Sequence, residues 1–219
     1  MTPQAVLFDL DGTLVDSAAD LALAVNRMRQ QRAQPPLPIA QYRPLVGSGA
    51  RGLLPIGLDA DPDSPSFASL RDEFFDTYEA CIGEATQPFD GVAQVLDALR
   101  VGQIPWGIVT NKIERLARPI VAGDPALAQC QALVGGDTTA HAKPHPLPLL
   151  HAAALLKVPP SGCIYVGDDR RDMLAGKSAG MTTVAARYGY IAADDDTATW
   201  PADHYIDSPL ELLTLLGIE

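Results

Sequence analysis

Two aspartates, Asp9 and Asp11, stand two positions apart directly after an apolar run that begins at Ala5. Carboxylates that close together in a partly dry site repel each other strongly unless a cation neutralises them. Gly12 follows and lets the chain turn sharply. A solvated turn at a strand end also fits this segment, but the pair favours a site where carboxylates act beside a cation.

Two further segments carry groups suited to phosphate. Thr110 and Asn111 follow an apolar run that ends at Val109. A hydroxyl and a neighbouring backbone N–H at the start of a helix can bind phosphate oxygens. Lys143 stands before a proline that is well placed to start the next helix, and its ammonium suits phosphate charge, although an exposed lysine is the ordinary alternative.

A second acidic cluster follows the apolar run that ends at Val166. Asp168 and Asp169 come directly after Gly167, and Asp172 follows one helical turn along. Clustered carboxylate oxygens at a strand end are the ligands that Mg²⁺ prefers, with water and substrate phosphate completing the octahedron. Capping of the next helix is the alternative role, and we expect it for one of the first two aspartates.

Apolar or β-branched runs alternate with helix-period segments along most of the chain. The expected strands are residues 5–10, 104–109, 132–134, 163–166, 182–186 and 204–206. The expected helices between them are residues 92–100, 114–121, 146–156 and 170–179. Such alternation predicts an α/β fold with a parallel sheet covered by helices on both faces. Right-handed crossovers bring the strand C-terminal ends to one edge, where these sheets bind ligands.

Residues 17–88 interrupt this alternation. Apolar residues between Leu21 and Met28 recur at helical spacing, a proline-rich linker follows, and a second helix is expected over residues 69–81. No convincing strand is found there. We therefore predict a helical insertion at residues 17–88 within a core made of residues 1–16 and 89–219.

Two helix starts carry capping signals. Ser17 is expected to cap the first helix of the insertion, with Asp20 as an acceptor near its N-terminus. At the other end of the chain, Ser208, Pro209 and Glu211 match an N-cap, a proline at the first helical position and a capping-box glutamate.

Composition narrows the possible partners. The chain has 219 residues, a hydrophobic share of 47% and a formal net charge of −11. An acidic chain repels nucleic acid and anionic membranes, so neither is expected as a partner. The absence of a secretory or membrane-spanning pattern, and three scattered cysteines without metal-site spacing, predict a cytoplasmic protein. Any phosphate site in so acidic a chain must depend on local groups or a bound cation.

The segment DLDGTLVDS, the pair Thr110-Asn111, Lys143 before proline and the segment GDDRRD resemble the four motifs of the haloacid dehalogenase-like (HAD) phosphatases in order and spacing, over essentially the whole chain. Within that superfamily the chain is most similar to the phosphoglycolate phosphatase group, on the segments VTNK, KPHP, VGD and YGY. The same segments also resemble the related N-acetylmuramic acid 6-phosphate phosphatases. The resemblance implies a Rossmann-like core, a small α-helical cap, Mg²⁺ as cofactor and a small phosphorylated metabolite as substrate. A monomer or a homodimer is expected.

The resemblance also implies a role for each matching residue. Asp9 is expected to attack phosphorus and form an aspartyl-phosphate, and Asp11 to act as the general acid and then the base. The expected metal ligands are the Asp9 carboxylate, the Asp11 backbone carbonyl and Asp168. Thr110, Asn111 and Lys143 are expected to bind the phosphoryl group.

The resemblance also bears on Asp169, Asp172 and Arg51. Asp169 and Asp172 are expected to orient the metal ligands without touching the metal themselves. Many relatives have serine where Asp169 stands, so an extra carboxylate near the metal is possible. Arg51 lies where relatives present a loop that reads the substrate, and its planar guanidinium could bind a substrate carboxylate. A surface arginine on a short helix is an equally good interpretation of Arg51.

Other classes of protein share part of this pattern. A phospho-accepting receiver module also uses a strand-end aspartate, a threonine and a lysine, but it lacks Asp11 and an inserted cap. A dehalogenase would have no use for Asp11 or for the cluster at Asp168. A phosphosugar mutase shares every catalytic residue, and only the fate of the substrate would distinguish it. We predict a Mg²⁺-dependent phosphomonoester hydrolase, most simply a phosphoglycolate phosphatase.

Overall fold

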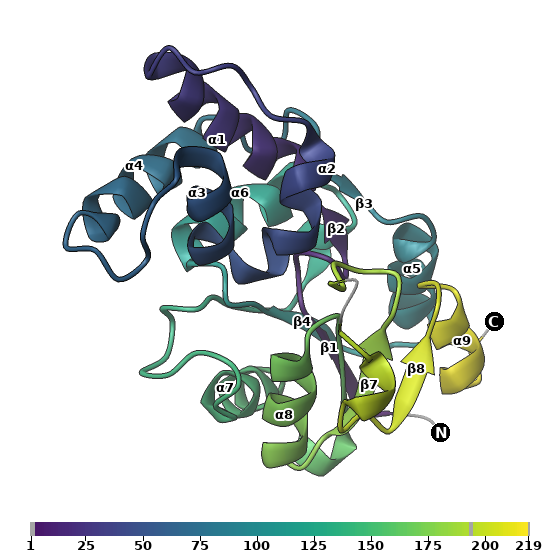
Figure 1. The fold of residues 1–219 in the computed structure, drawn as a ribbon. Helices are drawn as coiled ribbons and strands as arrows, with labels where there is room; N and C mark the ends of the chain where they lie inside the picture. Colours follow the sequence, from purple (N-terminus) through teal and green to yellow (C-terminus); the bar gives the residue numbers. More distant parts are fainter. Residues whose placement is uncertain (1–2, 193–194, 219) are drawn as a thin grey trace. The chain divides into compact units, whose positions relative to one another are not determined.

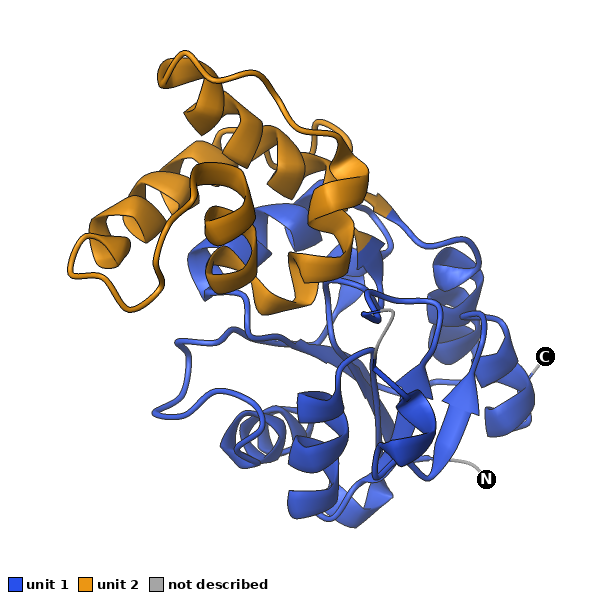
Figure 2. Ribbon diagram, in the orientation of Figure 1, with its two compact units in different colours: residues 1–15, 88–219 blue, residues 16–87 orange. Residues whose placement is uncertain are grey.

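The computed structural model describes residues 3–192 and 195–218. The chain divides into two compact units, which Figure 2 shows in different colours. Unit 1 consists of Met1–Val15 and Pro88–Glu219, and unit 2 of Asp16–Gln87. The chain passes between the units at two short strands that pair with each other, β2 (Val15–Asp16) and β3 (Gln87–Pro88).

Unit 1 is built on a parallel sheet. Within the described residues this sheet has six strands in the order β5-β4-β1-β6-β7-β8, and every neighbouring pair is parallel. The strands are β1 (Ala5–Phe8), β4 (Trp106–Val109), β5 (Ala132–Val134), β6 (Cys163–Gly167), β7 (Thr182–Ala186) and β8 (His204–Ile206). The chain builds outward from β1 on one side and then returns to add β6 on the other. Sheets of this kind bind ligands where the strand order reverses, which here is the C-terminal end of β1.

Helices cover both faces of the sheet (Figure 1), and its central strands β1, β4 and β6 are apolar runs that are buried along their whole length. Side chains alternate between the faces. Those of Leu7, Val109 and Tyr165 belong to a core with α7 and α8, whereas Phe8 and Val166 lie on the opposite face with residues of α5 and α9. The helices of unit 1 are α5 (Val92–Val101), α6 (Glu114–Gly123), α7 (Leu147–Leu156), α8 (Arg170–Ser178) and α9 (Glu211–Leu216). The predicted α/β class and parallel sheet are confirmed.

The helix predicted over residues 146–156 is confirmed as α7, whose first residue is Leu147, but Pro144 does not start it. The predicted start of α9 is wrong. Helix α9 begins at Glu211, and its N-cap position is Leu210 rather than Ser208. The Glu211 carboxylate does not close a capping box with Ser208, because it accepts the Asp207 N–H at 2.9 Å.

Unit 2 is helical. Its elements are α1 (Ala18–Gln31), α2 (Ile39–Tyr42), the 3₁₀ helix η1 (Arg43–Ser48), α3 (Ala50–Leu58) and α4 (Phe67–Glu79). The predicted stripe on α1, from Leu21 to Met28, is buried. Helix α4 starts and ends two residues earlier than the predicted 69–81, and β3 is the short strand that the sequence did not reveal.

The capping predicted for α1 is wrong. Ser17 occupies the N-cap position, but its side chain makes no capping hydrogen bond. Asp20 is fully buried, and its carboxylate accepts hydrogen bonds from the backbone N–H groups of Gly83, Ala85 and Thr86 and from the Thr86 hydroxyl. The Asp20 carboxylate therefore makes a tertiary contact instead of the predicted contact at the helix N-terminus. This contact joins the start of α1 to the last loop of unit 2.

The structure holds no described helix that is both long enough and apolar enough to cross a membrane.

Candidate active site

Asp9 lies directly after β1, at the edge where the sheet order reverses. The turn that follows it is closed by backbone hydrogen bonds, from Gly12 N–H to Val15 O at 2.9 Å and from Val15 N–H to Leu10 O at 3.0 Å. Gly12 has a φ of +84°, and a Cβ there would also collide with the Asp168 carboxylate. Only glycine meets both demands, because it has no side chain and tolerates positive φ. The turn thus brings the end of β1 against the end of β6.

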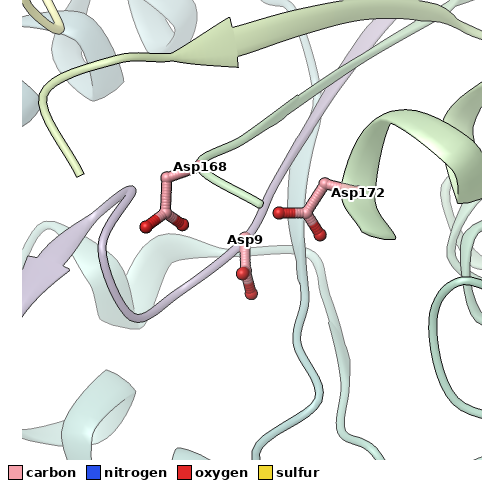
Figure 3. Close-up of side chains that lie close together, drawn as sticks. All are labelled: Asp9, Asp168 and Asp172. Carbon is pink, nitrogen blue, oxygen red and sulfur yellow. The ribbon is translucent and has the colours of Figure 1, made fainter. Parts of the chain in front are cut away.

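Asp9, Asp168 and Asp172 form the acidic cluster. One carboxylate oxygen from each of them lies within 4.8 Å of the others. Figure 3 shows Asp168 and Asp172 on either side of Asp9. Asp9 is 9% exposed, Asp168 5% and Asp172 1%, so water solvates these charges only slightly. Three buried carboxylates at this spacing require protons or cations to offset their repulsion.

Asp168 is fixed by groups from two separate loops. Its Oδ1 accepts the Thr13 hydroxyl at 3.1 Å, and its Oδ2 accepts the Tyr190 backbone N–H at 2.8 Å. Gly189 lies so close that a Cβ there would collide with Asp168. The residues of the Tyr-Gly-Tyr segment therefore act here as a backbone cradle for this carboxylate.

Asp169 and Asp172 share a capping box at the start of α8. The Asp169 side chain accepts the Arg171 N–H at 2.7 Å, and the Asp172 Oδ2 accepts the Asp169 N–H at 3.1 Å. This confirms that one of the two aspartates at 168 and 169 caps the helix, and it is Asp169. The capping box also directs Asp172 into the acidic cluster. From the sequence, Asp172 was expected only to orient the metal ligands.

Lys143 neutralises part of the cluster. Its Nζ lies 2.9 Å from Asp9 Oδ1 and 2.8 Å from Asp172 Oδ1, and its side chain is 2% exposed. It also donates to the Val109 carbonyl at 2.9 Å and to the Tyr165 hydroxyl at 2.8 Å. The sequence placed an ammonium near phosphate here but did not reveal these four partners. The sequence did not indicate a polar role for Tyr165, because it is an interior residue of an apolar strand.

Asn111 holds the Lys143 segment in place. Its Nδ2 donates to the Lys143 carbonyl at 3.0 Å, and its Oδ1 accepts the Lys143 N–H at 2.9 Å. Lys143 is thus positioned by a side chain from the end of β4 rather than by the N-terminus of α7. Thr110 is 3% exposed, and its hydroxyl accepts the Lys112 N–H at 3.1 Å. Direct contact of Thr110 or Asn111 with a substrate stays a prediction.

Asp11 stands outside the acidic cluster. Its Oδ1 pairs with Lys112 Nζ at 2.9 Å, and the two side chains are 18% and 7% exposed. An ion pair this sheltered has a defined geometry, so Lys112 directs the Asp11 side chain. Sequence reasoning passed over Lys112, although it belongs to the same strand-end segment as Thr110.

Arg51 belongs to unit 2, on α3. Its guanidinium pairs with Asp63 at 3.0 Å and lies 5.8 Å from the centre of the Phe67 ring. The Arg51 and Asp63 side chains are 65% and 87% exposed. Ion pairs this exposed contribute less than about 1 kcal/mol, so a competing carboxylate can displace Asp63 at little cost.

Burial controls the protonation of the cluster. Desolvation raises the pKa of Asp9 to about 7, although Lys143 lowers it, and desolvation with the Asp9 charge raises the pKa of Asp168 well above its usual range. Burial alone would lower the pKa of Lys143, but the Asp172 and Asp9 carboxylates more than reverse this and raise it. A buried ammonium therefore lies beside Asp9, and burial favours the protonated forms of Asp9 and Asp168 unless a cation replaces the proton. Such oxygen donors fit a hard divalent cation.

The family model of haloacid dehalogenase-like hydrolases matches residues 6–186. This stretch includes every residue of the cluster as well as Asp11, Thr110 and Lys143. The chain belongs to the haloacid dehalogenase-like hydrolase family, as the resemblance predicted.

Individual relatives match the chain over nearly its whole length. It is 47% identical over 210 residues to a phosphoglycolate phosphatase of Xanthomonas campestris, covering 96% of this chain and 95% of that one. It is 39% identical over 216 residues to an N-acetylmuramic acid 6-phosphate phosphatase of Pseudomonas aeruginosa, covering 99% and 96%. Among solved structures, one described as a predicted phosphoglycolate phosphatase from Haemophilus somnus matches with a TM-score of 0.85 at 25% identity, covering 98% of each chain. These relatives support the predicted enzyme class, a phosphoric monoester hydrolase.

Proposed function

We propose that this chain hydrolyses small phosphomonoesters at Asp9 with the help of Mg²⁺. The observation that carries the proposal is the buried cluster of Asp9, Asp168 and Asp172 at the end of the central strand, with the Lys143 ammonium against two of its members. A nucleophilic carboxylate beside a cation and a lysine is suited to phosphoryl transfer, where catalysis lies mainly in positioning and charge stabilisation.

The chain's own residues divide the chemistry between them. An Asp9 carboxylate oxygen attacks phosphorus, and the bond from phosphorus to the leaving alcohol breaks while Asp11 protonates that oxygen. Asp11 then removes a proton from water as the water oxygen bonds to phosphorus and the bond to Asp9 breaks. Lys143 and the Thr110 segment stabilise the charge of the transferring group.

The Asp9 and Asp168 carboxylates, with the Asp11 backbone carbonyl, are the proposed ligands of Mg²⁺, and Asp172 completes or orients the set. When bound, Mg²⁺ neutralises the repulsion between the attacking carboxylate and the phosphate dianion. The donor set suits it, because all of these donors are hard oxygens and two are carboxylates that burial leaves poorly solvated.

Mg²⁺ should stabilise the folded chain measurably. At a concentration about 100 times its Kd it contributes roughly 2.7 kcal/mol, which for this chain length raises Tm by about 5 °C or more. Asp168→Asn should abolish this gain, whereas Asp207→Asn, which breaks an exposed pair with Arg187, should retain it. Thermal melts with Mg²⁺ and with EDTA measure both variants. An equal Mg²⁺ response in Asp168→Asn would contradict the proposed site.

The Mg²⁺ requirement should also depend on pH. The pKa of Asp9 without metal is about 7, so below that pH a proton occupies the carboxylate that Mg²⁺ needs. The Mg²⁺ concentration that gives half-maximal activity should therefore rise as the pH falls from about 8 to about 6. A Mg²⁺ titration at each pH measures it, and an unchanged midpoint would mean that Asp9 does not compete for the metal.

Asp11→Asn should slow turnover by about 10²- to 10⁴-fold, since it removes the general acid and base but keeps the size of the side chain. Mg²⁺ stabilisation should be unchanged, because the backbone carbonyl is the proposed metal ligand at this position. Steady-state kinetics and thermal melts with Mg²⁺ measure these effects. Turnover within threefold of the native chain would show that the acid and base role belongs elsewhere.

The proposed substrate is 2-phosphoglycolate. The relatives of higher identity, at 44–47%, are named phosphoglycolate phosphatases. Arg51 is the proposed partner of the substrate carboxylate, which would replace Asp63 as the partner of its guanidinium. A cytoplasmic location and a monomeric or homodimeric state stay predictions from the sequence.

N-acetylmuramic acid 6-phosphate is the second candidate. Relatives named for that activity, at 37–39% identity, are as similar to this chain as a phosphoglycolate phosphatase of Chromobacterium violaceum at 37%. Both candidate substrates carry a carboxylate and a phosphate monoester, so Arg51 suits either of them.

Phosphate release from both substrates, with Mg²⁺ and with EDTA, tests the proposal. We expect 2-phosphoglycolate to be hydrolysed much faster, and EDTA to stop the reaction. Faster release from N-acetylmuramic acid 6-phosphate would reassign the substrate and keep the chemistry. A folded chain with Mg²⁺ that releases phosphate from neither of them, nor from an aryl phosphate, would overturn the proposed function and favour a mutase.

A further inference from the structure

Tyr165 is a buried tyrosine to which the catalytic steps above give no role. It lies on β6 with 0% exposure, and its hydroxyl reaches the middle of the site. The hydroxyl oxygen is 2.8 Å from Lys143 Nζ, 2.9 Å from the Val109 carbonyl oxygen and 3.0 Å from Asp172 Oδ1. A tyrosine placed only to fill the core would not require polar partners on three sides.

A count of protons shows what this hydroxyl supplies. The Lys143 ammonium has three N–H groups but four oxygens within 2.9 Å, those of Asp9, Asp172, Val109 and Tyr165. The Tyr165 hydroxyl brings a fourth proton, which it can donate to the Val109 carbonyl at 2.9 Å or to Asp172 Oδ1 at 3.0 Å. When the proton is donated to Val109, Lys143 satisfies the two carboxylates with two N–H groups, and its third faces only the tyrosine oxygen.

The Val109 carbonyl matters because it is buried. Val109 is 0% exposed, and a buried carbonyl without a donor is costly. Without the Tyr165 hydroxyl, the third Lys143 N–H has to remain on this carbonyl. When the Tyr165 hydroxyl donates to the Val109 carbonyl, the third Lys143 N–H can turn away without leaving that carbonyl unpaired. The tyrosine oxygen does not need this N–H either, because it already makes one hydrogen bond as a donor.

We propose that Tyr165 is a positioning residue whose hydroxyl holds the Val109 carbonyl and thereby frees one Lys143 N–H for the phosphoryl group. This inference rests on the proposed function of Lys143. In this proposal Tyr165 contacts neither the substrate nor the metal and acts through Lys143.

Tyr165→Phe tests the proposal, since it removes the hydroxyl and keeps the ring. We expect kcat to fall about tenfold to a hundredfold, with a similar loss of affinity for orthovanadate, which resembles the transferring phosphoryl group. The Mg²⁺ concentration for half-maximal stabilisation should stay within about twofold. Placing 4-aminophenylalanine at position 165, which restores an N–H donor toward Val109, should recover most of the lost kcat.

Tyr42→Phe is the matched control. Tyr42 is also 0% exposed, and its hydroxyl donates to Asn26 Oδ1 at 3.1 Å within unit 2. This variant should lose stability, as we also expect of Tyr165→Phe, while kcat and orthovanadate affinity remain those of the native chain. If Tyr165→Phe behaves in the same way as the control, its role is structural and the proposal is wrong.

Two other outcomes are also decisive. A selective loss of Mg²⁺ affinity in Tyr165→Phe would overturn the proposal, because the hydroxyl would then act through Asp172. If the native chain hydrolyses no phosphomonoester, the proposed function fails, but orthovanadate binding to the native chain and to Tyr165→Phe still tests whether the hydroxyl frees Lys143. Equal binding to the two would contradict the inference.

Discussion

Asp9→Asn is expected to reduce turnover by at least about 10⁴-fold, with the fold retained. An amide of nearly the same size replaces the carboxylate, so no cavity forms, but the nucleophile and one negative metal ligand are lost. Thr110, Lys143 and the rest of the site remain in place, so substrate can still bind. Steady-state kinetics with the preferred substrate measure the effect.

The stability of this variant gives a second, independent readout. The pKa of Asp9 is about 7 without metal, mainly because burial disfavours its ionised form. The folded state then binds a proton that the unfolded state has released between about pH 4 and pH 7, so an ionised Asp9 lowers stability above pH 7. Metal-free Asp9→Asn should therefore melt no lower than the native chain at pH 8. Retained turnover, or a much lower Tm, would contradict the role given to Asp9.

Lys143→Met is expected to have the largest combined effect. It removes the ammonium that Asp9 and Asp172 share, and leaves both carboxylates buried without it. Removing one partner of a buried ion pair destabilises a protein by about 3–5 kcal/mol. Loss of its hydrogen bond to the transferring phosphoryl group should reduce kcat by a further factor of about 10² to 10³. Denaturant unfolding and steady-state kinetics measure the two losses separately.

Mg²⁺ separates these two effects. It should restore part of the stability of Lys143→Met, because it also neutralises the cluster, but it should not restore turnover. Lys177→Met is the matched control, since it breaks a half-exposed pair with Asp203 and should cost no more than about 1 kcal/mol. A Lys143→Met variant as stable as this control, or as active as the native chain, would mean that Lys143 is not the partner of the cluster.

The sheet and its ligand-binding edge could be predicted because their signals are local. Apolar runs ending in aspartate, threonine or glycine mark strand ends, and the rule for parallel sheets brings those ends together. That reasoning predicted that Asp9 and Asp168 would meet. The same reasoning could not place Asp172 in the cluster, because the position of Asp172 depends on how closely the first turn of α8 follows β6. That spacing is determined by Asp169, which caps α8.

Residues acting across strands were harder to predict. Lys112 and Lys143 have long side chains whose carboxylate partners follow β1 or lie on α8, so their spacing in the sequence says nothing about which carboxylate each will meet. Tyr165 has the pattern of an ordinary core residue, and only its hydroxyl partners distinguish it. The sequence predicted that Asp20 accepts hydrogen bonds at the start of its own helix, but its carboxylate accepts them from a loop more than sixty residues away.

The two carboxylates near Gly12 have different surroundings. Asp9 lies with Asp168, Asp172 and Lys143 in a nearly dry cluster, whereas Asp11 pairs with Lys112 outside it. The sequence shows two aspartates two positions apart, but not that the turn sends them to different partners.

Trapping the phosphorylated enzyme tests directly whether Asp9 is the nucleophile. Borohydride reduces an aspartyl-phosphate to homoserine, so the native chain quenched during turnover with Mg²⁺ should contain homoserine at position 9 when its peptides are analysed by mass spectrometry. We expect this change at Asp9 alone, and none when EDTA or Asp9→Asn is used. Homoserine at another aspartate, or active turnover that never yields a modified Asp9, would mean that Asp9 is not the nucleophile.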